Sequence, residues 1–162
     1  MTTRALVLGG GGPVGIAWEI GLAAGLEQEG VRLADADLSG SLLHPMSPAL
    51  QRALDLAIEL RLRDGGTPDA GRRLRELAHA AGFSRNAASV TADAIGSKET
   101  ASQTAEWQAA YLEAPPFIAH ITSLGLATET EAREMAAAWR TWGAAPGAFW
   151  ARFWCQCLAW AD

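Results

Sequence analysis

The expected fold is decided by the stretch Arg4-Ala-Leu-Val-Leu-Gly-Gly-Gly-Gly-Pro-Val-Gly-Ile-Ala-Trp-Glu-Ile20, which reads as a buried strand, a glycine turn and the start of a helix. The apolar run from Ala5 to Leu8 is typical of a strand, and four glycines break it. Pro13 stands where a helix tolerates a residue without an N–H group. The pattern therefore predicts a helix N-terminus with free backbone amides, which suits an anion.

The glycine motif does not by itself identify this anion. The spacing Gly10-x-Gly12-x-x-Gly15 fits the dinucleotide fingerprint, and Asp35 lies twenty residues past Gly15, where a ribose-binding acid is expected. The same glycines also serve as the tight turn that any β-α unit needs. Phosphate, an adenosyl group, an oxyanion and no ligand at all are the alternatives for Gly9 to Gly12.

The first 35 residues resemble the patatin-like acyl hydrolases. The run Leu8-Gly-Gly-Gly-Gly-Pro-Val-Gly15, continued to Gly30, looks like their first strand, oxyanion-hole loop and first helix. In that family the amides of Gly10, Gly11 and Gly12 would stabilise the oxyanion of ester hydrolysis.

The nucleophile of that family is missing from the place where the resemblance predicts it. The segment Asp37-Leu-Ser-Gly-Ser41 follows instead of a Gly-x-Ser-x-Gly elbow, so Ser39 and Ser41 lack the flanking glycines. The one Asp-Gly-Gly sequence, at Asp64, falls in a polar loop between two helical patterns. An acyl hydrolase therefore remains an alternative function, for which the sequence shows no nucleophile.

Composition indicates one globular domain. The chain has 162 residues, of which 49% are hydrophobic, and a formal net charge of −5 that argues against nucleic acid as a partner. No apolar run approaches the length of a membrane span, and we expect a cytoplasmic protein. Cys155 and Cys157 are too few for a zinc site, and we expect buried free thiols.

The pattern along the chain alternates helices and strands. Gly30 is expected to cap the helix after Pro13, Ser47 and Pro48 open the next one, and Thr128-Glu-Thr-Glu131 is a capping box. An irregular loop is expected at 39–45. The predicted strands are 5–8, 31–37, 83–91 and 149–160, and the predicted helices after residue 45 are 48–63, 71–81, 98–112, 116–124 and 128–142. We expect the apolar face of the helix at 48–63 to comprise Leu50, Leu54, Ala57, Ile58 and Leu60 or Leu62.

The residues from about Asp35 onward resemble the C-terminal half of class I S-adenosylmethionine-dependent methyltransferases that act on small molecules. The resemblance is carried by Asp35-Ala-Asp-Leu-Ser-Gly-Ser-Leu-Leu-His-Pro-Met-Ser-Pro-Ala-Leu-Gln-Arg52, Gly71-Arg-Arg-Leu-Arg-Glu-Leu-Ala-His-Ala-Ala-Gly-Phe83, Met135-Ala-Ala-Ala-Trp-Arg140 and the aromatic run Phe149 to Trp160. It implies that Asp35 to Leu38 close the fifth strand, Phe83 to Thr91 form the sixth, and the last run is the seventh, antiparallel strand.

The resemblance also implies where ligands bind. The elements that hold the cofactor in that family lie upstream of this region, so Gly9, Gly10, Gly11, Gly12 and Asp35 are the candidates to bind S-adenosylmethionine. His44 would border the substrate pocket and act as a general base. Asp35, with Asp37, is equally well read as a solvated loop acid.

For other polar and aromatic side chains, a purely structural role is expected or is one of the alternatives. His79 and His120 fall in helical patterns and are expected at the surface. Trp107, Trp139 and Trp142 fall on helices that would cap the substrate pocket, where core packing and contact with a flat apolar substrate are the two alternatives.

The sequence therefore predicts a composite α/β chain. Residues 1–37 form a patatin-like strand, glycine loop and helix, and residues 38–162 form a methyltransferase-like region. The expected sheet is truncated, Rossmann-like and partly parallel, with about four strands, several helices and a long C-terminal strand. The expected function is S-adenosylmethionine-dependent methyl transfer to a small molecule with an incomplete set of catalytic parts. The non-enzyme alternative is an interaction module that self-associates through an open sheet edge.

Overall fold

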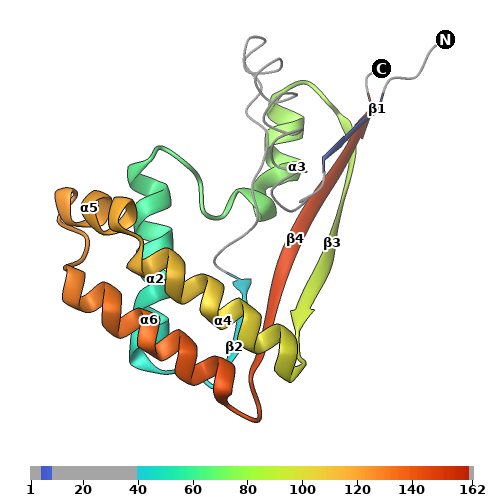
Figure 1. Ribbon diagram of the computed structural model, residues 1–162. Coiled ribbons are helices and arrows are strands. Elements are labelled where there is room, and N and C mark those ends of the chain that lie inside the picture. Colours follow the sequence, from blue (N-terminus) through green and yellow to red (C-terminus); the bar gives the residue numbers. More distant parts are fainter. Residues whose placement is uncertain (1–4, 9–39, 161–162) are drawn as a thin grey trace. The chain divides into compact units, whose positions relative to one another are not determined.

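The computed structural model of the chain describes residues 5–8 and 40–160 (Figure 1). The predicted glycine turn at Gly9 to Gly12, the helix after Pro13, the strand at 31–37 and Asp35 all lie outside the described residues. The predicted boundary between residues 37 and 38 lies outside them as well. The described residues thus comprise the first strand and most of the region that resembles the methyltransferases.

The described elements are mixed α and β. The strands are β1 (Ala5–Leu8), β2 (Leu42–His44), β3 (Arg85–Ile95) and β4 (Phe149–Trp160). The helices are α2 (Pro48–Arg63), α3 (Ala70–Ala80), α4 (Lys98–Glu113), α5 (Pro115–Ser123) and α6 (Glu129–Ala144). None of these helices is both long enough and apolar enough to span a bilayer.

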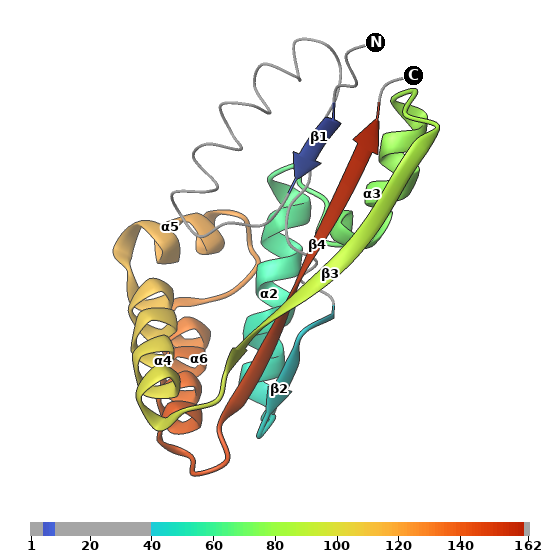
Figure 2. The ribbon, with the colours of Figure 1, turned by 90° about the vertical axis from the view of Figure 1, so that its right-hand side faces the viewer.

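The last strand, β4, is the centre of the sheet, because it pairs with each of the other described strands (Figure 2). Ala5 of β1 lies opposite Trp160, and Leu43 of β2 lies opposite Trp150, both in antiparallel register. Side-chain contacts show that β3 also runs antiparallel to β4, because Arg85 lies over Trp160 and Asp93 pairs with Arg152.

The antiparallel pairing of the described strands differs from the partly parallel sheet that the sequence predicts. Hydrophobic periodicity identifies a strand but carries no information about the direction of its neighbour. The presence of strands at 5–8 and 149–160 is confirmed with these bounds, and the predicted strand at 83–91 begins at Arg85 and extends to Ile95.

The chain divides into two compact units. Among the described residues, the first unit contains β1, Thr67–Ala92 and residues 153–160, and the second contains Gly40–Gly66 and Asp93–Arg152. The strands β3 and β4 therefore contribute residues to both units.

In the first unit, the buried residues come from the start of α3 and the end of β4. Ala70, Gly71 and Leu74 are buried on α3, and Cys157 and Ala159 are buried on β4. Cys157 is buried, as predicted, whereas Cys155 is only half-buried. Of the other residues of α3, Leu77 and Ala78 are half-buried and the rest are exposed.

The second unit has a core that is contributed mainly by α2, α4 and α6. Its largest fully buried side chains include Trp139, Trp142 and Met135, all on α6. α4 presents the small residues Ala101, Ala105 and Ala109 to this core. A Cβ atom built on Gly143 would lie 2.4 Å from the Cβ of Ala105, so the two helices approach closely at this glycine. The core comprises Leu43, Leu50, Ala53, Leu56, Ile95, Ala101, Ala105, Ala109, Leu112, Ile121, Ala127, Ala132, Met135, Ala136, Trp139, Trp142 and Trp150.

Local signals locate the ends of the helices in the second unit. The Ser47 side chain accepts a hydrogen bond from the N–H of Leu50 at 3.2 Å and caps α2. The predicted capping box of α6 is confirmed: the N–H of Thr128 donates to the Glu131 carboxylate at 2.7 Å, and the N–H of Glu131 donates to Thr128 Oγ1 at 3.2 Å. α5 begins at Pro115, one residue before the predicted start.

The buried face of α2 agrees with the predicted one in part. Leu50 is buried, and Leu54 and Leu60 pack half-buried against the core, as expected. Ala53 and Leu56 are buried in addition, whereas Ala57 and Leu62 are exposed. Several stripes of α2 are apolar, so the choice of face depends on which helix packs against it.

The short strand β2 was not predicted. Leu42–His44 lies within the segment 39–45 that the sequence assigns to an irregular loop. Three residues carry too short a pattern for a strand, and they adopt one because residues 149–151 of β4 pair with them.

Candidate functional site

His44 is the one predicted site residue that the described part of the chain contains. It is the last residue of β2, and its side chain is exposed. The preceding residue, Leu43, is buried in the core opposite Trp150. Because neighbouring side chains of a strand point to opposite faces, the burial of Leu43 directs the imidazole outward.

The backbone of His44 is held by an aromatic side chain. The indole N–H of Trp142 donates a hydrogen bond to the His44 carbonyl oxygen at 2.8 Å. Trp142 is 1% exposed, so this hydrogen bond joins a fully packed side chain of α6 to the edge of the site. The position of His44 is therefore determined by the core and not by the loop that comes after it.

Three tryptophans form the wall behind this backbone. The ring centroids of Trp139 and Trp142 are 5.4 Å apart with an interplanar angle of 83°, and those of Trp139 and Trp150 are 5.2 Å apart at 47°. Edge-to-face and tilted contacts of this kind are favourable for aromatic rings. For Trp139 and Trp142, the core-packing alternative is confirmed, since they are 2% and 1% exposed.

Gly147 completes the surroundings of the imidazole. A Cβ atom built on this residue would lie 3.9 Å from Cδ2 of His44 and 4.0 Å from its Nε2. The connection between α6 and β4 thus passes beside the ring and leaves it accessible.

The chemical capacity of His44 is that of an exposed imidazole. No described residue forms a hydrogen bond with its side chain, so no carboxylate in this part of the chain selects its tautomer. Both ring nitrogens are consequently accessible to a ligand or to water, one as a hydrogen-bond donor and the other as an acceptor when the imidazole is neutral.

The indole N–H of Trp150 is buried and has no hydrogen-bond partner among the described residues. Its ring lies under the Arg152 guanidinium, 5.1 Å from the ring centroid to Cζ, and is 7% exposed. A buried donor without a hydrogen-bond partner lowers stability.

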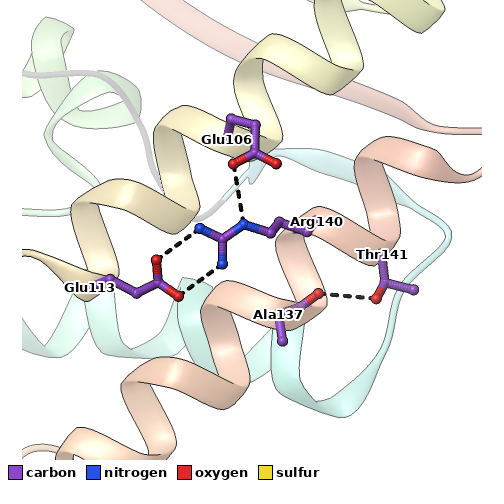
Figure 3. Close-up of polar contacts among 5 residues, drawn as sticks. All are labelled: Glu106, Glu113, Ala137, Arg140 and Thr141. Carbon is purple, nitrogen blue, oxygen red and sulfur yellow. Dashed lines mark hydrogen bonds and ion pairs between the residues drawn. The ribbon is translucent and has the colours of Figure 1, made fainter.

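The strongest electrostatic cluster of the second unit lies between α4 and α6 (Figure 3). Arg140 donates two hydrogen bonds of 2.8 Å to the carboxylate of Glu113 and one of 3.1 Å to Glu106. The hydrogen bonds raise the pKa of Arg140 and lower the pKa of Glu113. Because its donors already face these carboxylates, Arg140 joins two helices and is not available to an anion.

Three hollows on the surface of the second unit have walls that do not include His44. Their volumes are about 720, 300 and 540 Å³. The first is lined by Glu113, Pro115, Ile118, Ala119, Thr122, Ser123, Thr128, Glu129 and Arg133, the second by Gly96, Ser97, Lys98, Ala101, Ala144, Ala145, Pro146 and Ala148, and the third by Arg52, Glu59, Leu62, Arg63, Gly125 and Leu126.

The structure describes the other two histidines but not the other predicted binding residues. Gly9, Gly10, Gly11, Gly12 and Asp35 lie outside the described residues. His79 and His120 are exposed, as predicted, and Nε2 of His120 lies 3.5 Å from Asp64.

Trp107 and Ser41, which the sequence analysis also considered, lie in different surroundings. Trp107 is 63% exposed, which sets it apart from the tryptophans of α6. Ser41 is half-buried, and no described residue forms a hydrogen bond with it. The described residues also contain no cluster of side chains that could hold a metal ion.

Sequence reasoning missed the residues that support His44. Trp142 and Trp150 are 98 and 106 positions away from it, and no local pattern connects them. The same holds for Gly147, whose role depends on a close approach of two segments. Comparison of the chain with protein-family models and with curated protein sequences finds no match.

Proposed function

We propose that this chain is a methyltransferase-like protein that transfers a methyl group from S-adenosylmethionine to a small molecule, with a low rate because its donor site is incomplete. The observation that supports this best is β4, a long final strand that runs antiparallel to the strands it pairs with. A final antiparallel strand is what the resemblance implies, and a truncated Rossmann-like sheet is part of this proposal.

His44 is the residue to which we assign the acceptor side of the reaction. Its imidazole is exposed, and its backbone is anchored by the hydrogen bond from Trp142. A base held in this way can take the proton that an acceptor oxygen or nitrogen loses as it is methylated. Anchoring matters because most of the rate of such a transfer comes from the orientation of the acceptor.

The donor side is assigned to Gly9, Gly10, Gly11, Gly12 and Asp35, which lie outside the described residues. S-adenosylmethionine would supply an electrophilic methyl group. The three hollows described above support no second assignment, because their walls do not include His44. The backbone amides of the glycines and the Asp35 carboxylate are the groups that would bind the adenosyl part.

Calorimetric titration of the full chain with S-adenosylhomocysteine tests the donor side. We expect weak binding to the unaltered chain, a clear loss of affinity in Asp35→Ala, and no change in His44→Ala. The His44 variant is the matched control, because its side chain is assigned to the acceptor. Absence of heat at millimolar ligand would contradict methyl transfer as an activity of this chain.

The acceptor side is tested separately, by transfer of an isotope-labelled methyl group to a panel of small phenols and amines. We expect His44→Ala to lower the rate about a hundredfold, the usual contribution of a general base. Equal rates in the unaltered chain and in His44→Ala would contradict the role of His44. Such a result would not bear on the assignment of the donor site.

A further inference from the structure

The strand β3 is a long edge strand with little cover. Among the described strands it pairs with β4 and with no other, so one side of its backbone is left without a strand partner there. Ile95 is buried and Asn86 half-buried, and the other residues of β3 are exposed. Val90, near its middle, is 59% exposed. Such an edge presents a row of N–H and C=O groups to a further strand.

The middle of β3 carries neither charge nor proline, which are two of the usual devices that protect an edge. Residues 86–92 carry no charge, the strand contains no proline, and at 11 residues it is longer than a typical strand. Small and β-branched residues such as Ala88, Val90 and Thr91 fit the surface of a neighbouring strand well.

We propose that β3 pairs antiparallel with β3 of a second copy of this chain, about a two-fold axis at Ser89. This pairing is independent of the proposed methyl transfer. The two strands would add to each other over residues 85–93, with Ser89 opposite Ser89 of the second copy. The contact is of the closed, self-complementary type that two-fold dimers use.

Charge determines this register. The charged residues of β3 are Arg85 and Asp93, which have opposite signs and lie on the same face of the strand, because their separation is an even number of residues. An antiparallel partner centred on Ser89 puts Arg85 of each copy opposite Asp93 of the other. Opposite charges that face each other across two strands stabilise the pairing.

The competing registers are less favourable. A partner centred on Arg85, or a parallel partner in register, puts like charges opposite each other, which destabilises the pairing. A partner centred on Val90 leaves Arg85 opposite Ile95 and Asp93 opposite Ala87. A slip by one residue also moves each side chain to the other face of the sheet.

The contacts of β3 with β4 continue the alternation of charges across the sheet. Asp93 pairs with Arg152, and the Arg85 guanidinium lies 4.7 Å from the ring centroid of Trp160. In the dimer, each Asp93 would lie between Arg152 of its own chain and Arg85 of the second copy. The row of charges would thus alternate in sign across the joined sheet.

Sedimentation equilibrium of the full chain across micromolar concentrations is the first test. We expect a monomer–dimer equilibrium whose dissociation constant rises at least about tenfold in Ser89→Lys, because the two lysines meet on the axis. Ala110→Lys is the matched control, since Ala110 is exposed on α4, and it should leave the constant unchanged. Circular dichroism of Ser89→Lys establishes that a loss of dimer is not a loss of fold.

Disulfide trapping tests the register itself. Ser89→Cys should form a covalent dimer on mild oxidation, because the two thiols face each other on the axis. Thr91→Cys should not, since its partner position is Ala87 and the two introduced thiols would be about 14 Å apart. A mixture of Ala87→Cys and Thr91→Cys should cross-link. The unaltered chain controls for Cys155 and Cys157.

Three results would overturn the proposal. One is a chain that stays monomeric up to submillimolar concentration. Another is a dimer whose dissociation constant is the same in Ser89→Lys and in Ala110→Lys. The last is a cross-linking pattern in which Thr91→Cys alone forms the covalent dimer as fast as Ser89→Cys.

Discussion

At the scale of single residues, Trp142 is the side chain on which the candidate site depends. It is 1% exposed, contacts Trp139 edge to face and donates its indole N–H to the carbonyl of His44. Packing and hydrogen bonding thus act through one residue. A substitution that keeps an aromatic ring but removes the N–H separates the two contributions in part.

We expect Trp142→Phe to lower the free energy of unfolding by about 2 kcal/mol, because it leaves the His44 carbonyl oxygen without its donor and removes part of a buried ring. Urea unfolding measures the change. Trp107→Phe is the matched control: Trp107 is 63% exposed, and its replacement should change stability by less than about 0.5 kcal/mol. Equal losses in both variants would contradict the role of Trp142.

The second prediction at this scale concerns pH. Hydrogen bonds from Arg140 lower the pKa of Glu113, and hydrogen bonds from Thr128 lower the pKa of Glu131. A carboxyl group whose folded pKa is depressed contributes stability above its unfolded pKa, and this is lost as the pH falls through the folded pKa. We therefore expect the melting temperature to fall as the pH is lowered below the ordinary glutamate value of 4.5.

The variant Glu113→Gln should flatten part of this pH dependence, since it removes one of the two carboxyl groups named above whose pKa is lowered. Differential scanning calorimetry between pH 3 and pH 7 measures the effect. Arg140→Gln should flatten the same part, and the double variant should flatten it no further, because Glu113 and Arg140 act as a pair. A steeper dependence in Glu113→Gln would refute the assignment.

At the scale of secondary-structure elements, the close approach of α4 and α6 determines the second unit. Gly143 is the residue that permits it, because a Cβ atom there would lie 2.4 Å from Cβ of Ala105 and 3.0 Å from the carbonyl oxygen of Ala101. Neither neighbour is the flexible end of a long side chain. Added volume at this point must therefore move a helix.

We expect Gly143→Ala to destabilise the chain by about 1–3 kcal/mol, in spite of the higher helix propensity of alanine. Chemical denaturation measures the change. The matched control is Gly96→Ala, whose Cβ would meet nothing closer than 3.5 Å, at Phe149, and which should change stability by less than about 0.5 kcal/mol. A stabilising effect of Gly143→Ala would show that the two helices can separate freely.

The elements also show which local signals are sufficient. Pro48 after Ser47, and Thr128 with Glu131, predict the starts of α2 and α6 because the capping groups are adjacent in sequence to the amides that they satisfy. Leu42–His44 carries no such signal. It becomes β2 only through pairing with residues 149–151, more than 100 positions away in the chain.

At the scale of the whole molecule, burial differs greatly between helices of the two units. In the second unit, Ala105 on α4 and Ala136 on α6 are 2% and 0% exposed. In the first unit, the buried residues of α3 are confined to Ala70, Gly71 and Leu74. Regions with few buried apolar contacts open at a lower free energy than the global one.

We expect native-state hydrogen exchange to reflect this difference. The amides in the middle of α4 and α6 should exchange only through global unfolding, whereas those in the second half of α3 should exchange about a hundredfold or more faster. Mass spectrometry of peptic peptides measures both in one experiment, and all three segments are helices, so helix formation itself is controlled for. Equal protection of α3 and α4 would contradict the expectation.

The sequence by itself determined the elements whose signals are local, namely the strands at 5–8 and 149–160 and the capped helices α2 and α6. The tertiary structure alone decided the antiparallel partners of β4, the burial of Ala53 and Leu56 on α2, the hydrogen bond between Trp142 and His44, and the ion pairs of Arg140. The reason is physical, because hydrophobic period and capping act over a few residues. The other features arise between segments that are distant in sequence and meet only when the core is packed.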